Sequence, residues 1–300
     1  MMFWRIYNNQ IVSAEETELV GWDINAEYFE APDEYIEQKK FIVFRTCFGV
    51  GDWAMLERMP KALKQNYPDC EVYLPSPKMI RNIFGSLLNN WSSWGDASKT
   101  VDYVFKNNPY VDGYVDTWHT EIYHDHFRIW DSNNWKTPLT KQMCRFHHID
   151  YDDVSDASPK VYFDDEEIIQ GNDLIKNYPE EYYFLHISKR YKTEYARSLL
   201  ACIENLGVTD KPFVCYSDVD IKDTEFNKLN IIENIKYIEE PRMQFYIKSK
   251  AKIVITIQTG TSDLISGLTD VYSLSHYENV NSTYRNGNYV PSVNFINGVF

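Results

Sequence analysis

Short apolar runs, which predict buried strands, alternate along the chain with segments whose apolar residues recur at helical spacing. In the first half, this pattern predicts a strand at 41–45, a helix at 53–66, a strand at 71–74, a helix at 79–88, and strands at 101–105 and 114–115. Before them, strand-forming residues 3–7 and 10–13 flank Asn8-Asn9, which predicts a hairpin. Strands separated by helices indicate a parallel sheet with right-handed crossovers.

The second half shows the same alternation after an acidic stretch. Residues 150–159 contain few apolar side chains and end in Pro159, as linkers between domains do. Beyond them we expect helices at 166–176, 193–206 and 241–250, strands at 182–187, 213–216, 235–238 and 253–257, and a last helix ending at Leu268. The chain is therefore predicted to be an α/β protein with a first domain over 1–158, whose residues 1–40 are an extra segment, and a second domain over 159–300.

Composition and charge narrow the classes of function that the chain can have. The 300 residues include 30 Lys and Arg against 44 Asp and Glu, a net charge of −14. This balance argues against non-specific nucleic-acid binding, which depends on basic side chains. The five cysteines form no C-x-x-C pair, which indicates free thiols in a reducing compartment. With no signal-peptide pattern and no apolar run near the about 20 residues that span a bilayer, we expect a cytoplasmic protein without a membrane span.

The loop after the first-half strand at 41–45 holds candidate chemistry, since open parallel sheets bind ligands beyond the carboxyl ends of their strands. Residues 49–54 match the dinucleotide pattern G-x-G-x-x-A. The next strand, however, runs into Leu74-Pro75 rather than ending in the acidic residue that holds a ribose in dinucleotide-binding proteins. Asp52 is instead a candidate general base for an acceptor hydroxyl, or the cap of the following helix.

A basic loop follows the strand at 182–187. Ser188, Lys189 and Lys192 precede a predicted helix, and three cations fall within the four residues from 189 to 192. Hydroxyl and ammonium groups beside a helix start suit a diphosphate. The alternative is a solvated basic loop.

A hydroxyl-rich loop follows the strand at 253–257. Thr259, Gly260 and Thr261 offer hydroxyl groups and a backbone that an anion can approach closely. The alternative is an ordinary helix start capped by Thr261 or Ser262. Two such junctions in one half of the chain favour a nucleotide-diphosphate site.

The segment 119–126 reads H-x-E-x-x-H-D-H, which is compatible with a metal site. Its spacing differs from the H-E-x-x-H pattern of zinc proteases and aromatic residues surround it, so we expect no metal there. Trp118 and Trp130 are instead candidates for the wall of an acceptor pocket, because aromatic rings stack on sugar faces.

Three stretches, 44–69, 107–112 and 253–263, resemble the heptosyltransferase-like glycosyltransferases of family nine. The first is similar to that family's opening, in which a strand leads to Gly-Asp, a helix with an internal proline, and Tyr-Pro-Asp. The second is similar to its Asn-Pro-Tyr-Val-Asp segment, and the third to its donor-site D-T-G-x-x-H loop. Gln258 and Asp263 stand where the family has Asp and His.

This resemblance implies a GT-B architecture, in which two Rossmann-like domains face each other across a cleft. It implies an acceptor on the first domain, a nucleotide-sugar on the second, inversion at the anomeric carbon, and no required metal or other cofactor. It places Gly51 on the acceptor side and makes Asp52 the base. The donor-side residues that it implies are Ser188, Lys189, Lys192, Thr259, Gly260 and Thr261.

We therefore expect a glycosyltransferase that moves a sugar from a nucleotide-sugar to a hydroxyl of a glycan, a lipopolysaccharide-type molecule or another acceptor. Two other GT-B interpretations stay open. One is a glycosyltransferase that acts on modified bases in DNA. The other is a non-catalytic protein that binds a saccharide or a partner, which Gln258 and Asp263 favour. A dinucleotide oxidoreductase, resting on the G-x-G-x-x-A match alone, is a further alternative.

Overall fold

The chain forms two compact α/β units, each with its own parallel sheet. The computed structural model describes residues 2–7, 10–15, 33–43, 49–84, 97–116, 143–144, 147–150, 154, 158–187, 193–217, 225–235, 240–257, 260–274 and 293–296. The first unit comprises Met1–Ala157 and Thr283–Asn288, and the second comprises Ser158–Ser282 and Tyr289–Phe300. The predicted α/β class with parallel sheets is confirmed.

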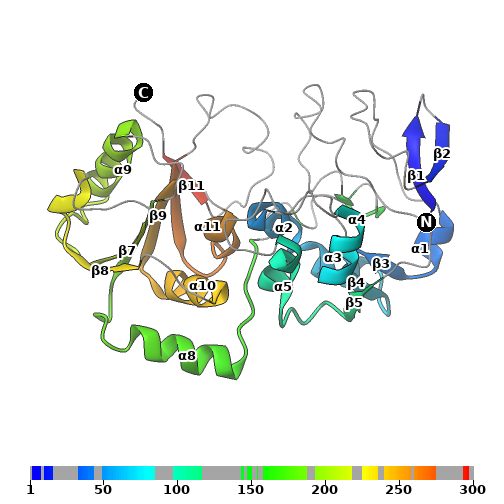
Figure 1. The fold of residues 1–300 in the computed structure, drawn as a ribbon, viewed down its shortest axis with the longest axis horizontal. Coiled ribbons are helices and arrows are strands. Elements are labelled where there is room, and N and C mark those ends of the chain that lie inside the picture. The colour runs from blue at the N-terminus through cyan, green and yellow to red at the C-terminus, as the bar shows by residue number, and fades with distance from the viewer. Residues whose placement is uncertain are drawn as a thin grey trace. The chain divides into compact units, whose positions relative to one another are not determined.

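The first unit combines an N-terminal hairpin with a three-stranded sheet (Figure 1). Its elements are β1 (Met2–Tyr7), β2 (Gln10–Glu15), α1 (Asp33–Glu37), β3 (Lys40–Ile42), α2 (Val50–Leu56), α3 (Met59–Asn66), β4 (Glu71–Pro75), α4 (Pro77–Phe84), the short helix η3 (Ala97–Lys99), α5 (Thr100–Phe105) and β5 (Gly113–Val115). Strands β3, β4 and β5 are parallel and adjacent in that order. The predicted hairpin is confirmed, because β1 and β2 pair antiparallel with Tyr7 opposite Gln10.

Two predictions for the first unit are wrong. The helix expected at 53–66 is divided, because α2 ends at Leu56 and α3 begins at Met59. Pro60 lies at the start of α3, where its missing N–H group is not needed. The strand expected at 101–105 is part of helix α5. Its buried side chains Val101, Val104 and Phe105 recur at helical spacing, so they cover one face of a helix.

The second unit is built on a six-stranded sheet. Its elements are α8 (Asp165–Ile175), β6 (Tyr183–Ile187), α9 (Thr193–Asn205), β7 (Phe213–Ser217), the short helix η6 (Glu225–Lys228), β8 (Ile231–Ile235), α10 (Pro241–Lys250), β9 (Ile253–Ile257), α11 (Gly260–Leu264), β10 (Asp270–Leu274) and β11 (Val293–Ile296). The strand order is β11-β10-β9-β6-β7-β8, and each neighbouring pair is parallel.

One predicted strand of this sheet overlaps the observed strand at a single residue. The strand expected at 235–238 shares Ile235 with β8, which begins at Ile231, and residues 236–238 lie outside the described residues. β8 lies at the edge of the described sheet, next to β7 alone. Glu233 and Ile232 are exposed along it, so the apolar pattern by which a buried strand is predicted is weak over this strand.

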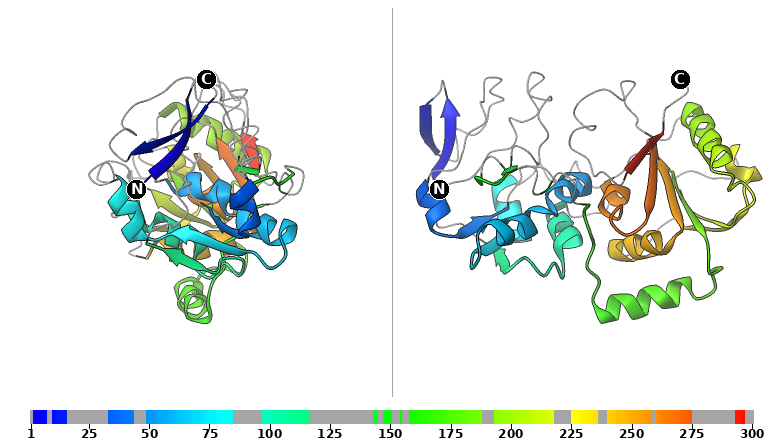
Figure 2. Two further views of the ribbon diagram at one scale, coloured as in Figure 1. Left: turned by 90° about the vertical axis from the view of Figure 1, so that its right-hand side faces the viewer. Right: turned by 180° about the vertical axis from the view of Figure 1, so that it is seen from behind.

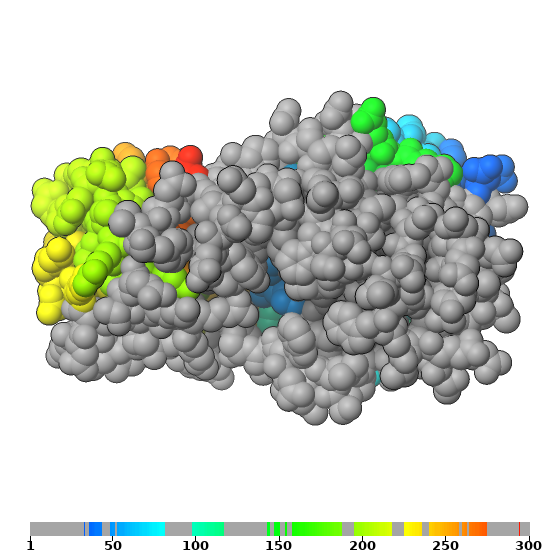
Figure 3. Space-filling view, turned by 90° about the horizontal axis from the view of Figure 1, so that it is seen from above, coloured from blue at the N-terminus to red at the C-terminus, as the bar shows by residue number. Residues whose placement is uncertain are grey.

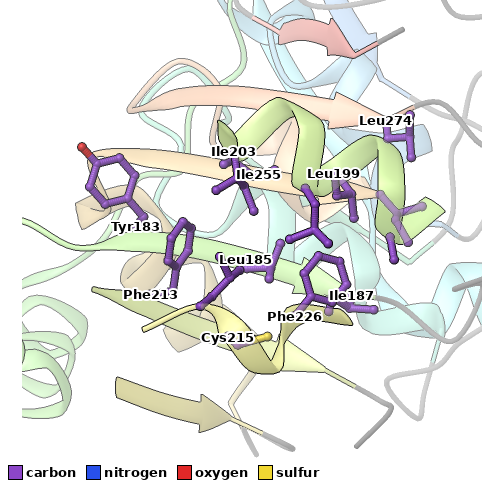
Figure 4. Packing of buried hydrophobic residues seen from close by; sticks show 14 of the residues in the cluster. Tyr183, Leu185, Ile187, Leu199, Ile203, Phe213, Cys215, Phe226, Ile255 and Leu274 are labelled. Atoms are coloured by element: carbon purple, nitrogen blue, oxygen red, sulfur yellow. The ribbon is translucent and has the colours of Figure 1, made fainter. Parts of the chain in front are cut away.

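Helices cover both faces of the six-stranded sheet (Figures 1 and 2). On one face, Leu185 and Ile187 of β6 and Ile255 of β9 join a buried cluster with Leu199 and other residues of α9 (Figure 4). The far side of α9 carries exposed residues, and the helix reaches the surface in the space-filling view (Figure 3, yellow-green). Each leucine or isoleucine buried in this way contributes roughly 1.5–3 kcal/mol to folding.

The opposite face of β6 carries the residues between these, because successive strand side chains alternate. Phe184 and His186 therefore point away from α9, and both contact Lys248 of α10. This alternation brings a polar group of β6 under helix α10.

None of the helices in the described ranges is long and apolar enough to cross a membrane.

Candidate functional site

The order of strands in the second unit reverses beside β6. This strand has β7 on one side and β9 on the other. After β6 the chain adds β7 and β8 on one side, and it then adds β9, β10 and β11 on the other side. In open parallel sheets, ligands bind at the carboxyl ends of the strands where such a reversal occurs. His186 of β6 lies opposite Thr256 of β9, one residue before each strand ends. The reversal therefore identifies this edge of the sheet as the candidate site.

A buried lysine ends at this edge. The side chain of Lys248 is 0% exposed. Its ammonium nitrogen, Nζ, lies 2.7 Å from Oγ1 of Thr261, 2.8 Å from Nδ1 of His186 and 3.2 Å from Oγ of Ser262. The same Nζ atom is 5.5 Å from the centre of the Phe184 ring, which supports a cation–π contact. Lys248 thus connects the end of β6 with the start of α11.

His186 is held in its neutral form. Burial, and then the adjacent Lys248 ammonium, lower the pKa of the imidazole well below its ordinary value. An ammonium group only donates hydrogen bonds, so Nδ1 of His186 accepts and Nε2 carries the hydrogen. The ring also meets the ring of Tyr216 edge to face, with centroids 5.1 Å apart. The imidazole is therefore fixed in one orientation and one tautomer.

Helix α10 is anchored at both ends, which fixes the position of Lys248. At its start, Oε1 of Glu240 accepts a hydrogen bond from the backbone N–H of Arg242. The hydroxyl group of Tyr182 donates to the backbone carbonyl of Ile247 at 2.5 Å, one residue before Lys248. A cation in the last turn also suits the helix dipole. The site lysine is thus carried by a rigid helix.

Comparison with known proteins identifies the fold. No family model matches the chain, and no curated protein matches it. A glycosyl transferase of family 9 from Veillonella parvula DSM 2008 superposes with a TM-score of 0.55 at 10% sequence identity, over 86% of this chain and 85% of that one. The ADP-heptose LPS heptosyltransferase II of E. coli gives a TM-score of 0.45 at 12% identity, over 86% and 89% of the two chains. This chain has the family 9 glycosyltransferase fold.

The predicted fold class, two α/β units each built on a parallel sheet, is thereby confirmed. Within the family 9 fold, two predicted donor-side residues, Gly260 and Thr261, lie at the start of α11. Thr261 contacts Lys248, so the structure brings it into the buried cluster. Four other predicted donor-side residues lie outside the described residues: Ser188, Lys189, Lys192 and Thr259. They adjoin the described ends of β6 and α11 in sequence.

The predicted acceptor side lies on α2 of the first unit. Gly51 and Asp52 are the second and third residues of this helix, and the side chain of Asp52 lies outside the described part. Because Asp52 lies inside α2, it is not the residue that precedes and caps the helix. The helix is anchored by Trp53, which is 1% exposed and meets the ring of Phe105 edge to face at 6.2 Å. Asp52 therefore directly precedes the buried residue that anchors α2.

The remaining predictions concern residues that the structure does not describe. Trp118, Trp130 and the segment 119–126 all lie outside the described ranges. Within those ranges, no group of three or more His, Cys, Asp or Glu side chains is placed to hold a metal ion.

Sequence reasoning missed the central residue of the site, Lys248. His186 fell within the strand predicted at 182–187 without being singled out, and Ser262 was named only as a possible helix cap. A signal did exist, since Lys248 directly follows the apolar residues Phe245, Tyr246 and Ile247 in a helix. That pattern does not distinguish it from the exposed Lys250 two residues later, because only the tertiary structure shows that α10 is covered on several sides.

Proposed function

We propose that this chain is a glycosyltransferase that moves a sugar from a nucleotide-sugar to a hydroxyl acceptor, with inversion at the anomeric carbon. The proposal rests chiefly on the polar cluster of Lys248, His186 and Thr261 at the strand reversal. A fold hosts many functions, so the family 9 architecture alone does not decide the activity. A buried lysine with two hydroxyl groups at the ligand-binding edge of such a sheet suits an anionic donor.

The donor diphosphate is proposed to lie between the two loops that follow β6 and β9. Ser188, Lys189 and Lys192 follow β6, and Thr259 and Gly260 lead into α11. Ammonium groups and backbone amides stabilise the negative charge that develops on a departing diphosphate. With these cations supplying the charge, the proposed reaction requires no metal ion.

The proposed chemical step is a direct displacement. The carboxylate of Asp52 takes the proton from the acceptor hydroxyl, and the hydroxyl oxygen forms a bond to the anomeric carbon of the sugar. The bond between that carbon and the diphosphate oxygen breaks, and its electron pair leaves with the diphosphate. One carboxylate on α2 therefore serves as the base, and the second unit stabilises the leaving group.

A thermal-shift screen tests the donor half of the proposal. The full chain is heated with UDP, GDP, ADP, CMP and their sugar conjugates, since a ligand that binds only the folded state raises its apparent stability. A selective shift with one nucleotide is expected and names the donor class. If no nucleotide and no nucleotide-sugar shifts the transition, the proposal is wrong and a non-catalytic saccharide-binding or partner-binding protein replaces it.

An Asp52→Asn variant tests the base. General bases typically contribute about 10²–10⁴-fold to rate, so transfer should fall by at least about 100-fold while nucleotide binding is retained. The matched control is Asp69→Asn, an exposed residue with φ of 67°, a conformation that asparagine also adopts. Normal transfer by Asp52→Asn would remove Asp52 from the mechanism.

A salt-dependent DNA gel shift would instead favour a DNA acceptor.

A further inference from the structure

The ammonium group of Lys248 holds together two chain segments that are distant in sequence. His186 ends the β6 side of the strand reversal, and Thr261 and Ser262 follow the β9 side. All three accept hydrogen bonds from the same nitrogen atom, at 2.8, 2.7 and 3.2 Å. An ammonium has three hydrogens, so it can donate one to each of these three acceptors.

Packing alone does not account for a lysine at this position. Removing an ammonium from water costs several kcal/mol unless its partners are well placed. The side chain is 0% exposed, and its neighbours along α10 are the apolar residues Phe245, Tyr246 and Ile247. A methionine of similar length would fill the same space without that cost. The lysine is therefore explained by what its ammonium group holds in place.

The hydroxyl groups that it holds belong to residues that directly follow the proposed donor loop in sequence. Thr261 directly follows Gly260, whose backbone is one of the proposed diphosphate contacts. A hydroxyl oxygen that accepts from a cation becomes a stronger donor through its own hydrogen, because hydrogen bonds in a chain polarise one another. Lys248 therefore both fixes the orientation of Thr261 and improves its hydroxyl as a donor to a phosphate oxygen.

We propose that Lys248 is a positioning residue for the donor diphosphate, acting through Thr261 and Ser262 at the start of α11 and through His186 at the end of β6. This inference rests on the proposed function and adds to it a residue of α10, outside the two loops. Because the ammonium donates to protein atoms, its role is to shape the site and not to touch the reacting atoms. Lys248 thus helps to bind the diphosphate of the donor and not its nucleobase or its sugar.

Inorganic pyrophosphate is the probe that tests this role, because it carries the diphosphate without a base or a sugar. Its dissociation constant is measured by calorimetry for the wild-type chain and for Lys248→Met. A lost hydrogen bond to a charged group corresponds to at least about a tenfold weakening, which is the expected result. The control, Lys250→Met, removes an exposed lysine from the same helix and should bind pyrophosphate as the wild type does.

Thr261→Val keeps the proposal testable if Lys248→Met does not fold. This variant keeps the side-chain shape, and it should also weaken pyrophosphate binding about tenfold, whereas Thr261→Ser should restore it. If Lys248 acts through Thr261, the double variant binds little more weakly than the weaker single variant. If Lys248 serves stability alone, its replacement lowers the melting temperature. The dissociation constants of the single and double variants then equal that of the wild type.

The outcomes separate this inference from the proposed function. If the wild type binds neither pyrophosphate nor any nucleotide-sugar, the proposed function is wrong and the inference falls with it. If the wild type binds pyrophosphate and Lys248→Met binds it equally well, the inference alone is wrong.

Discussion

The guanidinium group of Arg242 and the carboxylate of Glu167 form a buried ion pair that joins α10 to α8. Nε of Arg242 donates to Oε1 of Glu167 at 2.6 Å, and Nη2 donates to Oε2 at 3.0 Å. The two side chains are 2% and 7% exposed. Glu167 also completes a capping box with Asp164 at the start of α8. The helix that carries Lys248 is thus fixed at its first turn by a two-pronged contact.

Glu167→Ala should destabilise the protein strongly. Removing one member of a buried ion pair leaves the other charge buried, which costs about 3–5 kcal/mol. The control is Glu181→Ala, which breaks an ion pair with Lys252 whose side chains are 49% and 56% exposed. Exposed pairs contribute little to stability, because solvent screens the two charges. Urea denaturation measures both free energies of unfolding, and equal losses in the two variants would contradict the assignment.

Gly171→Ala should also destabilise the protein, although alanine is the better helix former by about 1 kcal/mol. A Cβ atom at Gly171 of α8 would lie 2.2 Å from Cδ1 of Tyr246. That ring is itself held against Phe163, with centroids 5.1 Å apart. Overpacking of this kind typically costs about 1–3 kcal/mol. Thermal unfolding measures the effect of Gly171→Ala in the wild type and in a Tyr246→Ala variant. The loss of stability caused by Gly171→Ala should disappear in the Tyr246→Ala background.

The sequence predicted most elements of the second unit but not how they meet. The apolar runs at 182–187 and 253–257 identified β6 and β9, because buried parallel strands are nearly continuous in apolar residues. That these two strands are neighbours, with His186 beside Thr256, is a long-range pairing. Nothing local in the chain encodes it, so the buried cluster around Lys248 was not predictable from spacing.

Helix α5 illustrates a local ambiguity. Residues 101–105 contain enough apolar and aromatic side chains to suggest a strand, and a run this short does not distinguish the two periods. The buried positions Val101, Val104 and Phe105 settle it as a helix. Asp52 is a different case. The sequence placed it just before a helix that begins at residue 53, whereas α2 begins at Val50 and includes it, and its role as a base stays a prediction.

The described cysteines should be inert to thiol reagents in the folded protein. Cys70, Cys144, Cys202 and Cys215 are all buried, and burial raises the pKa of the Cys202 thiol to about 11. Since the thiolate is the reactive form, both burial and pKa oppose reaction. In a Cys47→Ser variant, Ellman's reagent at pH 8 should therefore detect no thiol before denaturation and four afterwards. Rapid reaction of any thiol in the native variant would show that this packing is wrong.

His186 should make stability decrease below about pH 6.5, the ordinary pKa of histidine. Above that pH, the imidazole is neutral in both the folded and the unfolded chain, so it contributes no pH dependence. Below it, the unfolded chain binds a proton that the folded chain does not, because burial and the Lys248 ammonium lower the pKa in the folded state. The unfolded state is thereby favoured by up to about 1.4 kcal/mol per pH unit, until the pH reaches the folded-state pKa.

A His186→Asn variant isolates this effect, because the amide oxygen of asparagine can accept from Lys248 without titrating. The free energy of unfolding is measured in urea at pH 7.5 and 5.5 for both proteins. Carboxylates contribute equally to both and cancel in the difference. The variant should lose less stability than the wild type over this range, by up to about 1.4 kcal/mol. Equal losses in His186→Asn and the wild type would mean that His186 is protonated beside Lys248, contrary to the hydrogen bond that defines the site.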